Sequence, residues 1–289
     1  MPLCFFVSDL HGHPGRYRAL WKAVAAERPA AAFLGGDLLP SGVWARTHAD
    51  SLPQDFIGEY LEPEIVALRD RLGSSFPALV LILGNDDPRR VEPQLQAGEA
   101  AGLWIHLHGR KTVVAGFDVY GYACVPPTPF GLKDWERYDV ARTVDPGCVS
   151  PEEGWRSVPA DPTGVRFGTI ARDLEALCGA ADLRRSVLLF HTPPYRTLLD
   201  RAALDGQQVE GVPLDVHVGS IAVRRFIEAR APRITLHGHV HESARLTGSW
   251  RDAIGPTQLF SAAHDGPELA LVRFDPASPL TATRELIRV

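Results

Sequence analysis

Three histidines occupy alternate positions in residues 237–241, with Gly238 between the first two. They follow residues 233–236, a short apolar run that predicts a buried strand. Side chains of an extended segment alternate between faces, so all three imidazoles are expected to point the same way while Gly238 keeps the backbone narrow. Neutral imidazole is the most common side-chain ligand of divalent transition metals. The segment therefore predicts one edge of a metal site, with a histidine-rich surface turn as the alternative.

Other residues with metal-binding chemistry also come soon after short apolar runs. The runs are residues 3–7, 30–34, 78–83 and 186–190, and each predicts a strand buried on both faces. They are followed in turn by Asp9 and His11, by Asp37, by Asn85, Asp86 and Asp87, and by His191. Carboxylate, amide and imidazole groups ligate hard or borderline divalent cations. Each motif alone occurs by chance, but together and in this order they predict a metal site.

Predicted helices separate the first three strands. The spacing of apolar residues predicts one helix over residues 16–27 and another over residues 56–72, interrupted near Pro63. Strands and helices that alternate in this way form βαβ units with a parallel sheet and right-handed crossovers. Ligands of such sheets lie beyond the carboxyl ends of the strands. The residues expected at that edge are Asp9, His11, Asp37 and Asn85.

The remainder of the chain is less regular. Residues 105–122 predict two or three antiparallel strands, and residues 126–163 have no sustained period. So long an irregular segment is usually functional or mobile, which favours a rim or lid over the site; a plain surface insertion is the alternative. The other predicted elements are a helix over 167–178, a helix from the N-cap Ser220 to Ala229 and two or three strands over 258–289. Pockets are expected to be formed by the irregular segments 38–55, 123–165 and 195–218.

Composition is that of a water-soluble globular protein. Hydrophobic residues make up 45% and charged residues 22% of the 289 positions. No repeat or linker divides the chain, so residues 1–289 are predicted to form one domain. A net charge of −5 argues against a duplex-binding surface, although a site metal would still admit small anionic substrates.

The cysteines and the N-terminal segment indicate in which cellular compartment the protein is expected. Four widely spaced cysteines without a Cys-x-x-Cys motif predict free thiols in a reducing compartment, two of them in the core. No cleavable signal or long apolar span is found in the sequence. A cytoplasmic protein that does not contact membranes is therefore expected.

The motifs at the strand ends resemble those of the calcineurin-like metallophosphoesterase superfamily. The matching segments are Asp9-Leu10-His11, Gly36-Asp37, Gly84-Asn85, His191 and Gly238-His239-Val240-His241. The resemblance implies an α/β fold, a four-layer α-β-β-α sandwich of two mixed β-sheets flanked by helices, with a two-metal hydrolytic site. By the family pattern, Asp9, His11 and His241 would hold one metal. Asn85, His191 and His239 would hold the other, and Asp37 would bridge both.

This ligand set implies a particular hydrolytic chemistry. Two cations about 3.5–4 Å apart share a hydroxide generated near neutral pH and neutralise charge on the phosphoryl oxygens. Histidine ligands favour Mn, Fe or Zn over Mg or Ca. We therefore expect hydrolysis of a small phosphoester by a metal-bridging hydroxide, with a phosphodiester favoured. The alternatives are a phosphomonoesterase, a nuclease and, less favoured because every ligand position is filled, an inert metal-binding scaffold.

Four positions depart from the family pattern or lie beside it. The segment after Gly36-Asp37 lacks the Asp-Arg-Gly continuation of the protein Ser/Thr phosphatase branch, which disfavours that substrate class. Many members have histidine where this chain has Asp86; an ionised aspartate there predicts weak protonation of the leaving group and favours diesters. The alternative is that Asp86 acts as a general acid, which requires a substantially raised pKa, to which the adjacent Asp87 would contribute. His13 is interpreted as a solvated turn residue, with a proton donor or phosphate contact as the alternative. For His237, a supporting or packing role is favoured over direct chemistry.

Overall fold

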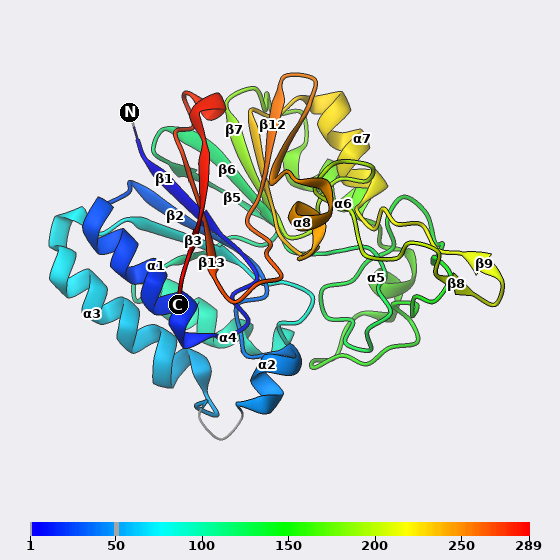
Figure 1. The fold of residues 1–289 in the computed structure, drawn as a ribbon, viewed down its shortest axis with the longest axis horizontal. Helices are drawn as coiled ribbons and strands as arrows, with labels where there is room; N and C mark the ends of the chain where they lie inside the picture. The colour runs from blue at the N-terminus through cyan, green and yellow to red at the C-terminus, as the bar shows by residue number, and fades with distance from the viewer. Residues whose placement is uncertain (1, 49–51) are drawn as a thin grey trace.

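Two six-stranded β-sheets pack face to face at the centre of the molecule (Figure 1). The computed structural model describes residues 2–48 and 52–289. One sheet has the strand order β14-β13-β1-β2-β3-β4, and the other has the order β11-β12-β10-β7-β6-β5. Each sheet has parallel strands at its centre and at least one antiparallel strand at an edge. Both sheets are therefore mixed, as the predicted fold requires.

The first sheet is built on the runs that the sequence predicts as strands. Its parallel strands are β1 Cys4–Val7, β2 Ala31–Gly35, β3 Ala78–Ile82 and β4 Ile105–His106. Antiparallel β13 Leu269–Phe274 and β14 Thr283–Ile287 extend it beyond β1. Side chains of β1, β2 and nearly all of β3 are buried, because helices cover one face and the second sheet covers the other.

The second sheet follows the same plan. Its parallel strands are β6 Phe117–Tyr122, β7 Ser186–Phe190, β10 Ile234–His237 and β12 Thr257–Ser261. Antiparallel β5 Arg110–Val114 and β11 Arg251–Ile254 form its edges. Leu188, Leu236 and Phe260 are buried in the core that the two sheets share.

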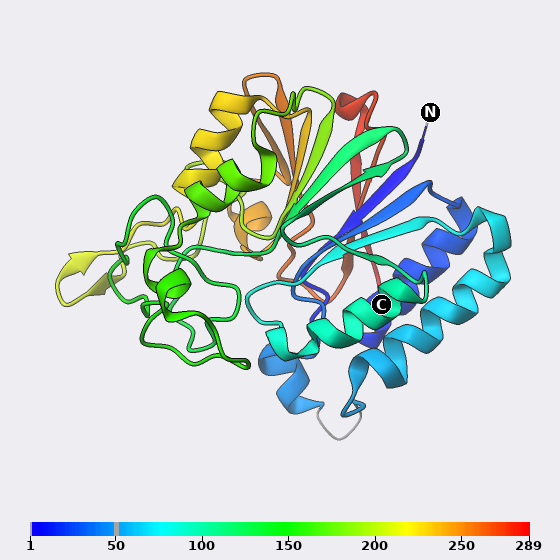
Figure 2. The same cartoon turned by 180° about the vertical axis from the view of Figure 1, so that it is seen from behind.

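Helices complete the outer layers of a four-layer sandwich (Figures 1 and 2). On the first sheet lie α1 Pro14–Glu27, α3 Glu62–Leu72 and α4 Glu92–Ala100. On the second lie α6 Ile170–Cys178 and α7 Ile221–Arg230. Short helices α2 Gly42–Thr47 and α8 Ser243–Thr247 follow β2 and β10. The Ser220 hydroxyl accepts a hydrogen bond from the amide of Val223, so Ser220 is the N-cap of α7 as predicted.

Residues 123–169 and 195–218 extend the molecule at one end, with α5 Pro162–Phe167 and the hairpin β8 Gln208–Val209/β9 Val212–Pro213 (Figure 1). The first of these segments has a polar core of its own. Lys133 and Glu136 form an ion pair in which both side chains are fully buried, and Glu136 also accepts from Thr128. These contacts fix an irregular backbone that has no sheet to pair with.

Three predicted elements differ from the structure. Residues 105–122 do not form one antiparallel unit: β4 joins the first sheet parallel to β3, and only β5 and β6 pair antiparallel. Residues 56–72 are helical throughout, and the interruption predicted near Pro63 is a change of helix type: a π-helical turn at Ile57–Leu61 passes directly into α3, with Pro63 in the first turn of α3. The helix over 167–178 begins only at Ile170, since Gly168 and Thr169 separate it from α5.

The structure also bears on the predicted free thiols and on the predicted lack of a membrane-spanning segment. Cys4, Cys124, Cys148 and Cys178 are free, and all but Cys148 are buried. Within residues 2–48 and 52–289, no helix has both the length and the apolar character needed to cross a membrane.

Candidate metal centre

One group of potential ligands forms where β1, β2 and β10 end. Asp9, His11, Asp37 and His241 each offer a ligand atom, and these atoms lie within 4.8 Å of one another. His241 Nε2 is 3.3 Å from Asp9 Oδ1 and 3.2 Å from His11 Nε2. Two imidazole nitrogens this close repel through their lone pairs unless a proton or a cation lies between them. Two carboxylates with two imidazoles fit a borderline divalent cation.

A second group lies beside the first and shares Asp37 with it. His191 Nε2 is 3.3 Å from Asp37 Oδ2 and 3.1 Å from Asn85 Oδ1. Its Nδ1 is 2.8 Å from the Gly35 carbonyl oxygen, a contact that fixes the ring and leaves Nε2 facing the other ligands. The ring of His239 lies 5.2 Å from that of His191. All seven residues predicted as metal ligands are therefore brought to one edge of the sandwich.

Carboxylates and imidazoles in these groups perturb each other's protonation. Burial alone would lower the pKa of His191, but the neighbouring Asp37 and Asp9 carboxylates raise it to about 10. Burial also opposes protonation of His241, yet its hydrogen bond and charge interaction with Asp9 raise the pKa. Burial and the nearby His191 lower the pKa of His239 to about 3. Despite burial, the neighbouring histidines lower the pKa values of Asp9 and Asp37.

Metal loading at neutral pH is therefore expected to release at least one proton per protein. His191 is protonated below its raised pKa, and a cation must displace that proton to bind Nε2. Metal affinity should rise as the pH rises from 5 towards 9, since fewer protons then compete. Calorimetric titrations with Mn²⁺ in buffers of different ionisation enthalpy measure the release. His191→Asn should reduce it and His217→Asn, outside both groups, should not; an unchanged release in His191→Asn would contradict the assignment.

Several ligand residues have an unusual backbone. Asp9, His11, Asp37 and His239 have φ values of 56°, 47°, 51° and 73°. Such left-handed conformations are costly for residues other than glycine and cluster at functional sites. Hydrogen bonds hold two of the loops together: the amides of Asp9 and His11 donate to the carbonyls of Gly36 and Asp37, at 2.9 and 2.8 Å. The turn after β1 is thus fixed against the turn after β2.

Asp87 fixes the third ligand loop, a supporting role that the sequence did not predict. Its buried carboxylate accepts hydrogen bonds from the amides of Leu38, Leu39 and Gly84 at 3.0, 2.8 and 2.9 Å. Its carbonyl oxygen accepts from Trp135 Nε1 at 2.8 Å. Asp87 therefore joins the loop after β2 to the loop after β3, and Asp37 and Asn85 are positioned by the same carboxylate.

The expected alternation of the three histidines is wrong. β10 ends at His237, and the left-handed conformation of His239 turns the chain out of the strand. His237 is fully buried; its Nδ1 lies 2.9 Å from the Thr192 carbonyl oxygen and its Nε2 lies 2.7 Å from Thr235 Oγ1. Both ring nitrogens are engaged away from the ligand groups, so His237 packs beneath the site.

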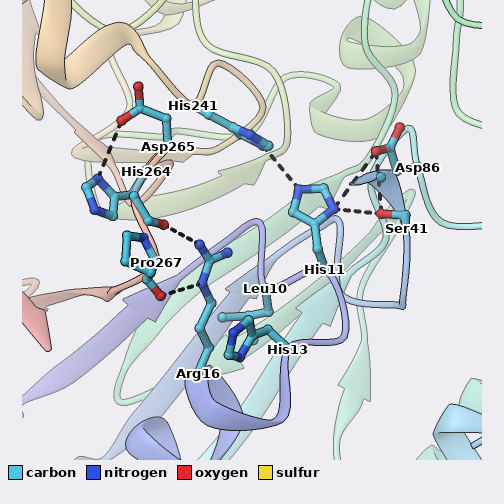
Figure 3. A pocket seen from close by; sticks show the side chains of 12 residues that line it. Leu10, His11, His13, Arg16, Ser41, Asp86, His241, His264, Asp265 and Pro267 are labelled. Carbon is cyan, nitrogen blue, oxygen red and sulfur yellow. Dashed lines mark hydrogen bonds and ion pairs between the residues drawn. The ribbon is translucent and has the colours of Figure 1, made fainter. Parts of the chain in front are cut away.

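Asp86 and Ser41 lie beside the first ligand group. Ser41 Oγ is 2.6 Å from His11 Nδ1 and 3.5 Å from Asp86 Oδ2 (Figure 3). Burial and the nearby Asp37 carboxylate raise the pKa of Asp86 to about 7. Cations bound by the adjoining ligands would act in the opposite direction, because they favour the ionised carboxylate. Ser41 lies in a loop without a motif, and nothing in the sequence distinguishes it.

His13 is not simply a solvated turn residue. It is half-buried and forms the N-cap of α1, where its Nδ1 accepts a hydrogen bond from the amide of Gly15 at 3.1 Å. Histidine is not among the residues favoured as N-caps, so helix propensity gave no signal for this role.

A cavity of about 540 Å³ opens beside His11 and His241 (Figure 3). Its other lining residues are Leu10, His13, Arg16, Ser41, Gly42, Asp86 and residues 264–267. The prediction of which segments form the pocket is therefore largely wrong for this cavity. Segment 38–55 contributes only Ser41 and Gly42, with positions 49–51 outside the described residues, and segments 123–165 and 195–218 contribute nothing. The cavity wall comes instead from α1 and the loop after β12.

Comparisons with known proteins support the family and the fold. A family model described as calcineurin-like phosphoesterase matches residues 4–243. One solved structure, 17% identical, aligns over 99% of this chain and 100% of its own with a TM-score of 0.59. TT1561 of Thermus thermophilus aligns over 99% of both chains at 15% identity with a TM-score of 0.54. A dimetal phosphatase from Danio rerio covers 94% of this chain and 92% of its own at 11% identity, TM-score 0.51. A search of curated proteins gives no match.

Proposed function

The chain belongs to the calcineurin-like phosphoesterase family, and from this membership and the ligand geometry we propose a two-metal hydrolase of small phosphoesters. The observation that carries the proposal is the sharing of Asp37 between two groups of N and O ligands. Asp37 lies within ligand reach of Asp9, His11 and His241 on one side and 3.3 Å from His191 on the other. A carboxylate between two such groups suits a bridge between two cations.

Seven residues would hold the two cations, and neighbouring groups would orient two of the ligand rings. When bound, two cations lower the pKa of water and neutralise charge on the phosphoryl oxygens. Asp9, His11 and His241 would hold one cation, Asn85, His191 and His239 the other, with Asp37 between them. The donor set favours Mn, Fe or Zn. The Gly35 carbonyl oxygen lies 2.8 Å from His191 Nδ1 and orients that ring. Ser41 Oγ lies 2.6 Å from His11 Nδ1 and orients the His11 ring in the same way.

Metal analysis and turnover of bis(p-nitrophenyl) phosphate test the proposal together. We expect two equivalents of bound metal, activity that chelation abolishes, and recovery on adding Mn²⁺. Two bound metals without turnover of diesters or monoesters would indicate the inert scaffold instead. A nuclease would cleave single-stranded oligonucleotides in preference to the small diester.

Asp86 favours diesters over monoesters. An ionised carboxylate near the site repels the dianion of a monoester more than the monoanion of a diester. With cations bound at the adjoining ligands, Asp86 would be ionised despite its raised pKa of about 7, and it would then offer no proton to the departing oxygen. We therefore propose a phosphodiesterase, with the phosphomonoesterase as the second candidate.

Rates on a series of aryl and alkyl diesters are expected to depend steeply on the pKa of the leaving group. Good leaving groups need little protonation, so aryl esters should be cleaved faster than alkyl esters. Asp86→His should make the dependence shallower and raise the rate on alkyl esters. The matched control is Asp118→His: Asp118 lies on β6 and forms an ion pair at the surface with Lys111 of β5, so this change should leave the dependence as it is in the wild type. A flat dependence in the wild-type enzyme would mean that another group supplies the proton.

A further inference from the structure

Arg16 lines the cavity with part of its hydrogen-bonding capacity unused. Its Nη1 donates to the Asp9 carbonyl at 2.7 Å, its Nη2 to the Gly266 carbonyl at 2.6 Å and its Nε to the Pro267 carbonyl at 3.4 Å. A guanidinium carries five N–H groups, so one N–H on each Nη has no acceptor among the described residues. Figure 3 shows Arg16 reaching from α1 to the 264–267 loop.

The positive charge of Arg16 has no ion-pair partner among the described residues, although the carboxylates of Asp9 and Glu268 lie close enough to interact with it electrostatically. All three acceptors are neutral carbonyls, and none of the carboxylates in residues 2–48 and 52–289 forms an ion pair with it. A partly buried guanidinium without a carboxylate is unfavourable unless an anion completes it. The other charged residue of this wall, Asp265, is already neutralised by Arg245, with Nε and Oδ2 2.7 Å apart. The Arg16 guanidinium therefore presents to the cavity a positive charge that no ion pair neutralises.

The loop after β12, to which Arg16 donates two of its hydrogen bonds, is held in place by contacts of its own. His264 Nε2 lies 3.1 Å from Glu268 Oε2, and Arg284 Nη2 donates to the Ala263 carbonyl at 2.7 Å. A side chain on Gly266 would meet His264 and Glu268 at 2.4 and 2.6 Å, so the loop is tightly packed. A site held in this way needs little rearrangement to receive a ligand.

The cavity lies beside the first ligand group and is not lined by the residues specific to the second. His11 and His241 line it, whereas Asn85, His191 and His239 do not. A phosphoester whose phosphoryl group lies between the two ligand groups would extend one ester substituent past His11 and His241 into the cavity. A volume of about 540 Å³ accommodates a substituent much larger than a methyl group.

We propose that Arg16 binds an anionic group, a carboxylate or a second phosphate, on the ester substituent that is retained after hydrolysis. The inference rests on the proposed function and specifies its substrate class. Asp86 lies with Ser41 and His11 at another part of the lining, so it does not neutralise Arg16. A guanidinium with two free N–H groups favours oxyanions, which accept charge-assisted hydrogen bonds.

A matched pair of substrates tests the proposal. Both are p-nitrophenyl phosphodiesters; one has a 2-carboxyethyl group and the other the neutral 2-carbamoylethyl group of nearly the same shape. The leaving group is identical, so the ratio of their kcat/KM values reports recognition of the charge alone. We expect the carboxylate to be preferred about tenfold or more, the range of a charge-assisted hydrogen bond. A 2-phosphonoethyl ester in the same assay decides between carboxylate and phosphate.

Variants then assign the preference to Arg16. In Arg16→Gln the ratio should fall to about one. In Arg16→Lys it should be intermediate, because lysine keeps the positive charge but lacks the planar set of N–H donors that binds an oxyanion through two hydrogen bonds. Arg18→Gln, on the exposed side of α1, should leave the ratio unchanged. A general loss of activity through the bond to Asp9 cancels in the ratio. A wild-type ratio near one, or a ratio that survives Arg16→Gln, would overturn the inference while leaving the phosphoesterase proposal intact.

Binding without turnover separates this inference from the proposed function. Calorimetry on the Mn²⁺-loaded protein compares 2-carboxyethylphosphonate with 2-carbamoylethylphosphonate. Preference for the carboxylate that disappears in Arg16→Gln, together with no hydrolysis of any ester, would support the anion site and refute the proposed activity. Equal binding of both compounds would refute the anion site.

Discussion

Replacing Asp37 by asparagine is expected to abolish hydrolysis and to weaken retention of both cations. The Asp37 side chain is 3% exposed, its Oδ2 is 3.3 Å from His191 Nε2, and its Oδ1 accepts from the amide of Asp86 at 2.8 Å. Asparagine keeps the shape but removes the negative charge that two cations would share. The loss should exceed the about 10²–10³-fold cost of removing one hydrogen-bond donor to a transition state.

Metal content and kcat/KM of the Asp37→Asn protein provide the measurement. The control is Asp70→Asn, which removes an exposed aspartate of α3 far along the helix from the site. It should keep two metals and full activity. Two tightly bound metals with wild-type turnover in Asp37→Asn would show that the two-metal assignment is wrong.

Gly238→Val is expected to lower activity more than it lowers thermal stability. A Cβ at this position would lie 2.8 Å from both Asp9 Oδ2 and Ser8 Oγ. The same carboxylate accepts from the amide of His239, with Oδ1 at 3.0 Å. The added side chain must therefore displace Asp9 or His239. A misplacement of roughly 1 Å can cost about a hundredfold in rate, whereas overpacking typically costs about 1–3 kcal/mol of stability.

The matched control places the same substitution in another crowded position. In α4, a Cβ on Gly98 would lie 2.1 Å from the ring of Trp104. Gly98→Val should lower the melting temperature while the folded protein keeps its specific activity and metal content. If Gly238→Val behaved in the same way, Gly238 would have a packing role and no role in placing the ligands.

The strands of the core and the chemistry at their ends could be predicted from the amino-acid sequence alone. Runs such as residues 78–83 are apolar throughout, so they must be buried on both faces. Parallel strands place their carboxyl ends together, so the motifs from Asp9 to His241 were expected at one edge, where the structure has them. These inferences need only local pattern and strand direction.

Which residues support and surround that edge is visible only in the folded protein. Arg16 reaches Gly266 across 250 positions, and Asp87 gathers amides from the loop after β2. Neither contact can be recognised from periodicity or spacing, because the side chain in each contact is bonded to a backbone atom, and every residue carries such atoms. The left-handed turn at His239 likewise depends on packing against Asp9, whose carboxylate accepts its amide. Backbone partners are set by the packing of distant segments, and this is why the cavity and its charge could not be predicted from the sequence.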